Sequence, residues 1–381
     1  AEFYCANMTV EMDDTDKLKV LFEDAVKNFG MTFEPPDVNR GRYRFEPVTD
    51  KVIRYGLGAV KGTGQLAVEA IVKAREEGGP FTSLFNFCVR IDRQRINKRT
   101  VEALIKAGAF DAIQQNRASL VASIDRAFDF AAATDANAAQ VDIFGDCEHG
   151  SAAQEPDLVE ATPWGVKERL TYEKTAVGFY LSGHLFDEVA HEVRRFCKRP
   201  IDELMDSREQ QVIAGIVSDL RVINGQRGRL AIFKLDDKSD SIEATADQNV
   251  LDANRNTLKD DELVIVSGRL QPGRGGFEAR FQVQQVWDLA AARCRFGKFL
   301  RVAVNGKAPD IARLVKDFPP RIEVSEAGEL RNGLPVRLSL ARNGAQVELQ
   351  LGESAKFFPT DAALASWTAQ AEAGKAAVVY D

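Results

Sequence analysis

Hydrophobic positions in the first 30 residues are spaced as on one face of helices. The stretch Glu34-Pro35-Pro36 ends this pattern, and residues 42–60 then alternate and carry aromatic side chains, which predicts short strands leading into a turn. Helices joined by glycine turns are expected from residue 56 to 113, followed by a helix from Ala118 to about Ala133. The apolar stripe of the first helices consists of Met12, Leu18, Leu21, Phe22, Val26 and Phe29.

The pattern changes twice more along the chain. Residues 134–163 are small, polar and acidic, with one apolar island at 141–144, and are predicted to form an exposed linker. After a helical patch, the period shifts to two from Gln211 onward. Five short strands with a helix-like interval near 247–259 follow the order of an OB-fold barrel. A mixed unit begins after about Leu289, so the fold class is multidomain α+β.

Composition is that of a soluble globular chain. The 381 residues are 45% hydrophobic and 28% charged, enough for two to four domains, and no apolar run is as long as a membrane span. Five scattered cysteines predict free thiols in a reducing cytoplasm, and neither they nor the three histidines have the spacing of a zinc site. The start at Ala1, directly in an amphipathic pattern, is typical of an excised fragment.

Charge is distributed unevenly along the chain. The net charge is −7, but residues 40–120 hold 15 Lys/Arg against 8 Asp/Glu. A basic segment inside an acidic chain favours one module that contacts phosphates.

A glycine-rich hairpin is the densest motif. An apolar residue, Lys61 and a Gly-x-Gly that opens a helix form the helix-hairpin-helix pattern for binding duplex DNA. Its glycines let the backbone approach a phosphate, and the helix start offers unpaired N–H groups and a positive dipole end. Such contacts read the DNA backbone, so binding is expected to be sequence-independent and weakened by salt. The predicted contacts here are Gly56, Gly58, Lys61, Gly62, Thr63 and Gly64.

Two other interpretations of the hairpin remain open. Glycines of this kind also mark dinucleotide sites, although the expected hydrophobic strand and the later acidic residue are missing, and they also serve plain interhelical turns. A second helical pair follows with a basic run, which is either a solvated face or a further phosphate contact. The candidates in this run are Arg93, Arg95, Lys98 and Arg99.

Several strings in this order resemble the alpha subunit of bacterial DNA polymerase III, a C-family replicative polymerase. They are RYGLGAVKGTGQLAVEAIVKARE, FTSLFNFCVRID, LIKAGAFDAI and TYEKTAVGFYLSGHLFDE, and the similarity extends through LDDKSDSIEA. The resemblance implies six parts: the end of the fingers domain (1–50), a helix-hairpin-helix domain (51–135), a linker with a clamp-binding peptide (136–163), a helical connector (164–208), an OB-fold domain (209–290) and a C-terminal domain (291–381).

No catalysis is expected from this chain. The family's palm, with its Mg²⁺-binding carboxylates, would precede the region, so no cofactor is predicted here. The acidic cluster Asp13/Asp14/Asp16 lies at a helix start, and Asp236/Asp237/Asp240 lies in a hairpin turn, where acids have structural roles.

An apolar peptide stands alone in the linker, which suggests a docking site. Gln140-Val141-Asp142-Ile143-Phe144 resembles the motif by which the family's alpha subunits bind the sliding clamp, the beta subunit. In that resemblance Gln140 hydrogen-bonds in the clamp groove while Ile143 and Phe144 fill apolar pockets. The alternative is a small hydrophobic staple onto a neighbouring helix.

The barrel is expected to contact single-stranded DNA through basic loops and stacking aromatics. The residues predicted for this surface are Arg227, Arg229, Phe233 and Arg274. Family resemblance alone places a contact with the clamp-loader tau subunit in the C-terminal domain, and makes the rest of the polymerase core a partner. Alternatives are an error-prone relative of the alpha subunit or a standalone repair module with the same two DNA-binding parts.

Overall fold

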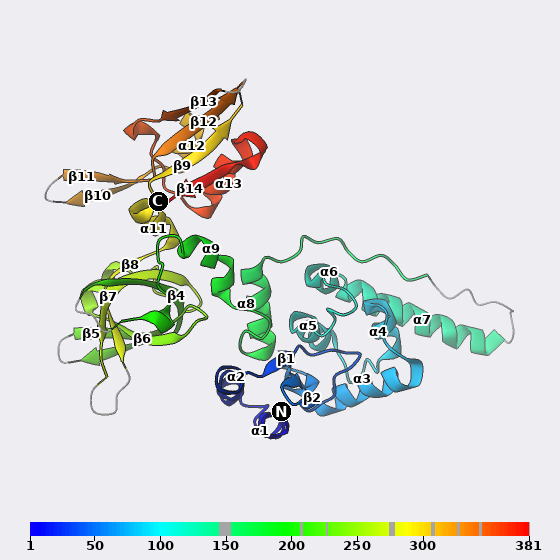
Figure 1. Ribbon diagram of the computed structural model, residues 1–381. Coiled ribbons are helices and arrows are strands. Elements are labelled where there is room, and N and C mark those ends of the chain that lie inside the picture. Colours follow the sequence, from blue (N-terminus) through cyan, green and yellow to red (C-terminus); the bar gives the residue numbers. More distant parts are fainter. Residues whose placement is uncertain are drawn as a thin grey trace. The chain divides into compact units, whose positions relative to one another are not determined.

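The computed structural model describes residues 1–144, 154–205, 209–225, 228–273, 279–305, 309–325, 328–342 and 345–380. The chain divides into two compact units, Ala1–His184 and Leu185–Asp381. Figure 1 shows helices prevailing in the first unit and strands in the second.

The first unit contains eight α-helices within its described residues. They are α1 (Glu2–Val10), α2 (Thr15–Phe29), α3 (Gln65–Gly78), α4 (Leu84–Arg90), α5 (Lys98–Lys106), α6 (Arg117–Ala122), α7 (Ile124–Phe144) and α8 (Val166–Val177). A three-stranded sheet in the order β1-β3-β2 joins them, made of β1 (Thr32–Glu34), β2 (Glu46–Thr49) and β3 (Val52–Arg54).

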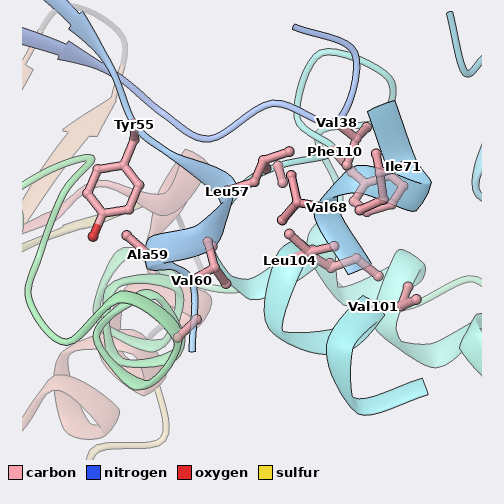
Figure 2. Close-up of a cluster of buried hydrophobic side chains, with 14 of the residues drawn as sticks. Val38, Tyr55, Leu57, Ala59, Val60, Val68, Ile71, Val101, Leu104 and Phe110 are labelled. Carbon is pink, nitrogen blue, oxygen red and sulfur yellow. The ribbon is translucent and has the colours of Figure 1, made fainter. Parts of the chain in front are cut away.

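One hydrophobic core spans this whole unit and crosses the predicted boundary at residue 50. β3 pairs parallel with β1 and antiparallel with β2, and this pairing crosses the boundary. Buried side chains from Tyr4 to Phe179 belong to the same core, which means that the first 50 residues pack as part of the hairpin domain. Figure 2 shows part of this core, where Val68 of α3 lies next to Leu104 of α5 and Ile71 lies beside Phe110.

Much of the predicted linker, residues 136–163, belongs to the first unit. Helix α7 continues to Phe144, and residues 154–161 form an extended strap on the first unit rather than a free segment. The Ser83 hydroxyl donates to Glu155 at 2.6 Å, and the Val159 amide donates to the Ser123 hydroxyl at 2.8 Å. Leu158 packs against the core. The predicted connector, residues 164–208, is divided between the two units. Its helix α8 buries Ala176 and Val177 in the core of the first unit.

The second unit begins with the 3-10 helix η2 (Leu185–Glu188) and the short helix α9 (Ala190–Val193). It contains a closed five-stranded barrel in the order β4-β5-β6-β8-β7. Its strands are β4 (Gln211–Gly225), β5 (Gly228–Asp236), β6 (Ser241–Ala246), β7 (Leu263–Gln271) and β8 (Arg280–Trp287). Helix α10 (Gln248–Ala253) lies between the third and fourth strands, and β6 pairs parallel with β8. This confirms the predicted OB-fold, with its helix in the predicted interval.

The last part is mixed α/β, as predicted. Its sheet has the order β13-β12-β9-β14 and packs with α12 and α13 around Trp367, while β10 and β11 form a separate hairpin. The bounds are α11 (Leu289–Phe296), β9 (Phe299–Val304), α12 (Ile311–Asp317), β10 (Arg321–Ser325), β11 (Gly328–Asn332), β12 (Val336–Arg342), β13 (Ala345–Gln350), α13 (Asp361–Gln370) and β14 (Ala376–Val379).

Candidate nucleic-acid interface

The glycine turn before α3 is built so that its backbone faces outward. Val60 is fully buried and anchors the turn, while Lys61, Gly62 and Gly64 are exposed. Gly62 has φ +79°, a conformation that side chains other than glycine rarely adopt. No atom lies within 4 Å of the position that a Cβ would take on either glycine, so the space beside the turn is open.

Helix α3 begins at this turn with unsatisfied donors. Gly64 is its N-cap, and a glycine has no side chain to accept from the first amides. Within the described part of the chain, the amides of Gly64, Gln65 and Leu66 have no hydrogen-bond acceptor. Free N–H groups and the positive end of a 14-residue helix together favour an anion.

A second helix start lies against the same turn. The Thr100 hydroxyl, in the first turn of α5, donates to the Gly62 carbonyl oxygen at 3.2 Å. Asn97 caps α5 by accepting from the Thr100 amide at 3.0 Å, and Ile96 is fully buried as Val60 is. The starts of α3 and α5 therefore form one surface, which sequence spacing alone did not show.

The cations of this surface fall into two groups. Lys61 and Arg99 are exposed and have no ion-pair partner among the residues that the structure describes. Arg95 pairs with Asp92 at 3.2 Å, Lys98 with Asp125 at 2.5 Å, and Arg93 with Asp135. Lys61 and Arg99 are thus available to a phosphate without breaking an ion pair.

Three of the residues predicted to contact DNA are buried or closely packed in the turn. A Cβ on Gly56 would lie 2.7 Å from the Tyr43 carbonyl oxygen, and one on Gly58 would lie 2.4 Å from the Tyr43 ring. The Gly58 amide already donates to that carbonyl at 3.0 Å. Thr63 is 4% exposed, so its side chain faces the interior. These glycines are required by the close approach of the chain around Tyr43.

The predicted stacking aromatic of the barrel is also wrong. Phe233 is 1% exposed and belongs to the barrel core, because inward and outward residues alternate along β5. Arg229 pairs with Asp252 at 2.8 Å, whereas Arg227 and Arg274 lie outside the described residues.

The outer face of the barrel offers different candidates. Ile232 on β5 points outward and stands in register with Arg221 on β4 and Thr245 on β6. Arg221 is exposed and has no ion-pair partner in the described ranges. The alternation along β5 was visible in the sequence and could have assigned Ile232 rather than Phe233 to the surface.

The acidic clusters have the structural roles expected of them. Asp14 caps α2 by accepting from the Lys17 amide at 3.2 Å. Asp237 is buried, pairs with Arg194 at 2.5 Å and accepts from the Ser239 hydroxyl in the β5–β6 turn. In the described part of the chain, no three His, Cys, Asp or Glu side chains are grouped to hold a metal ion, and no helix is long and apolar enough to cross a membrane.

The predicted clamp peptide occupies the end of α7, whose last residue is Phe144. The side chains of Gln140, Val141, Asp142, Ile143 and Phe144 lie outside the described residues. The helix before them is fixed on the first unit, because Ala127 and Ala131 are fully buried and the Phe130 ring meets Phe85 edge-on at 5.7 Å.

Comparisons with known proteins agree with both DNA-binding parts. A family model described as a helix-hairpin-helix motif matches residues 30–120, and one described as an OB-fold nucleic acid binding domain matches residues 211–289. The DNA polymerase III alpha subunit of Neisseria meningitidis serogroup B is 40% identical over 92% of this chain. The chain belongs to the DNA polymerase III alpha-subunit family and matches its C-terminal region.

Two further alpha subunits show the same relation. Those of Pseudomonas aeruginosa and Escherichia coli K12 are 36% and 32% identical, each over 95% of this chain. The chain spans about 30% of the length of these relatives, and the matched share is 30%, 32% and 31% of the three proteins.

Proposed function

We propose that this chain holds duplex DNA through the turn at residues 60–64 and the start of α5. The observation that carries the proposal is the combination, on one surface, of free amides at the start of α3 with two unpaired cations, Lys61 and Arg99. Amides, a helix dipole and flexible cations all recognise phosphate oxygen and none of them reads a base edge. Binding is therefore independent of sequence, as a replicative polymerase requires.

In this proposal, the chain positions DNA and does not copy it. The polymerase activity named for the relatives, with its Mg²⁺, belongs to the part of those proteins that this chain does not span. The barrel contacts the unpaired template on its outer face, where Arg221 and Thr245 flank the apolar Ile232. The C-terminal sheet serves the clamp-loader tau subunit, by family resemblance.

We also propose that the peptide ending at Phe144 binds the sliding clamp. Two observations support this. The peptide is the end of α7, a helix that is packed on the first unit through Phe130, and the chain is fixed to that unit again where Glu155 accepts from Ser83. A clamp bound between two such anchors would stay linked to the DNA-binding surface, which is the arrangement that processivity requires.

The duplex site is tested by substituting its cations. At low salt, Lys61→Ala and Arg99→Ala are each expected to weaken binding to a 20-base-pair duplex severalfold, measured by fluorescence anisotropy. Lys73→Ala is the matched control, because Lys73 lies on α3 beyond its first turns and pairs with Glu77. Equal affinities of all three variants and the wild type would contradict the duplex site.

The clamp site is tested separately. Binding of immobilised sliding clamp is compared for the wild type, the Ile143→Ala/Phe144→Ala double variant and Asn137→Ala, a control on the same helix outside the peptide. The double variant is expected to lose binding while the control retains it. Undiminished binding by the double variant would overturn the clamp assignment and leave the duplex site untouched.

A further inference from the structure

Helix α7 lies beside the basic loop that precedes α5. Its position is fixed by buried Ala127 and Ala131 and by the edge-on contact of Phe130 with Phe85 on α4. Figure 1 shows α7 running next to α4 in the first unit. Because the helix backbone is held by packing, the carboxylates on this face are held near the loop as well.

Two of these carboxylates engage cations of the DNA-binding surface. Asp125 Oδ1 lies 2.5 Å from Lys98 Nζ, and Asp135 accepts from the Arg93 guanidinium. The Lys98 ammonium also lies 5.8 Å from the centre of the Phe128 ring. Hydrogen bonding to Asp125 raises the pKa of Lys98, so the side chain stays charged while it is paired.

The pairs are exposed enough to be exchanged. The side chains of Lys98 and Asp125 are 48% and 82% exposed, and those of Arg93 and Asp135 are 24% and 61% exposed. An ion pair in water contributes little, because solvent screens it and long side chains lose freedom. A DNA phosphate at the neighbouring helix starts can therefore replace either carboxylate as the partner of its cation. Only the side chain of Lys98 or Arg93 has to move for this exchange.

We propose that Asp125 and Asp135 set the affinity of the duplex site by competing with phosphate for Lys98 and Arg93. The inference rests on the proposed duplex function. In the free protein the two carboxylates hold these cations, which leaves Lys61 and Arg99 to make the first contact with DNA. Each exchange then adds a phosphate contact and frees a carboxylate, so the net gain in affinity is smaller than for an unpaired cation. A site weakened in this way releases DNA more readily as the duplex advances.

The test is neutralisation of the competitors without loss of volume. Asp125→Asn and Asp135→Asn are each expected to tighten binding to a duplex at low salt by about 1.5- to 5-fold, the range for one exposed ion pair. Asp129→Asn is the matched control, since Asp129 is exposed on the same helix and acts on Lys98 only through its charge, without a hydrogen bond or ion pair in the described residues. Its effect is expected to be smaller.

A double-mutant cycle separates competition from a general change in charge. In a Lys98→Ala background, Asp125→Asn is expected to lose its effect, because the cation for which it competes is gone. A gain that persists in that background, or an equal gain from Asp129→Asn, overturns the proposal, as does unchanged affinity in both variants. The proposed duplex site would still stand in each case if Lys61→Ala weakens binding, so the two failures are distinguishable.

Discussion

The Thr100 hydroxyl donates a hydrogen bond to the Gly62 carbonyl oxygen at 3.2 Å, which joins the start of α5 to the turn that opens α3. Thr100 is 5% exposed, so this bond lies within the protein while the amides and cations around it face solvent. The bond holds two helix starts from different segments together in the proposed duplex-binding surface.

Replacing Thr100 by valine removes this hydrogen bond at nearly constant volume. We expect the free energy of unfolding to fall by about 1 kcal/mol, because the hydrogen bond from the buried Thr100 side chain to Gly62 is lost. Duplex affinity is expected to fall too, since the turn is no longer held in place. Thr100→Ser retains the hydroxyl and should keep both properties near the wild type. Urea unfolding and anisotropy check the result, and a valine variant with normal duplex affinity would contradict it.

Substitutions at two glycines of the hairpin should have opposite consequences. A Cβ on Gly58 would lie 2.4 Å from the Tyr43 ring, so Gly58→Ala is expected to cost about 1–3 kcal/mol of stability. Gly64 has φ −72° and open space around it, so Gly64→Ala should change stability by less than about 1 kcal/mol.

The same pair distinguishes structural from functional glycines. Gly64→Ala is expected to weaken duplex binding, because the added methyl group stands where a phosphate would approach the first amides of α3. Thermal melting and duplex titration of both variants provide the comparison. A stable Gly58→Ala variant, or normal DNA binding by Gly64→Ala, would refute this division.

Sequence patterns predicted the kinds of elements well because each pattern reports local physics. The alternation along the barrel strands and the Gly-x-Gly before α3 are local signals, and the structure has a barrel and a hairpin where they occur. Helix α7 extends to Phe144, beyond its predicted end at about Ala133. The added segment is rich in alanine, the best helix former, but its polar side chains led us to predict a linker there.

Long-range pairings were beyond the sequence. Nothing near Val52 in the chain indicates that it pairs with Thr32, and the ion pair of Lys98 with Asp125 joins residues on separate helices. The division of the basic run into paired and unpaired cations therefore required the structure. The same holds for Tyr43, whose position determines why Gly56 and Gly58 must be glycine.

Acid should destabilise the second unit through Glu192. Burial alone would raise the pKa of Glu192, but hydrogen bonds and the charge of Arg293 outweigh it and lower the pKa below its ordinary value near 4.5. Both carboxylate oxygens lie 2.7 Å from the Arg293 guanidinium. A lowered carboxyl pKa contributes stability that is present above pH 4.5 and is lost as pH falls through the folded-state pKa.

Glu192→Gln should remove this contribution. We expect the variant to be less stable at neutral pH by about 2 kcal/mol, because Arg293 loses a charged hydrogen-bond partner. Its melting temperature should also depend less on pH below 4.5 than that of the wild type. Melting curves between neutral and acidic pH measure both effects. Parallel pH profiles for the two proteins would show that Glu192 does not contribute in this way.

Substitutions at two barrel residues should distinguish an effect on stability from an effect on binding of single-stranded DNA. Phe233→Ala is expected to cost about 3–5 kcal/mol, since it empties a fully buried site in the barrel core. Arg221→Ala should leave the melting temperature unchanged and weaken binding of oligothymidine, with Lys316→Ala on α12 as a control of equal charge change. Normal oligothymidine binding by Arg221→Ala would exclude this part of the outer face.

The salt dependence of duplex binding tests the central claim most directly. Each phosphate contact contributes about 0.9 to the slope of log K against log salt concentration. If Lys61 and Arg99 contact phosphates, the Lys61→Ala/Arg99→Ala double variant should give a slope shallower than the wild type by about two. A double variant whose line runs parallel to that of the wild type would contradict the duplex-binding surface at the starts of α3 and α5.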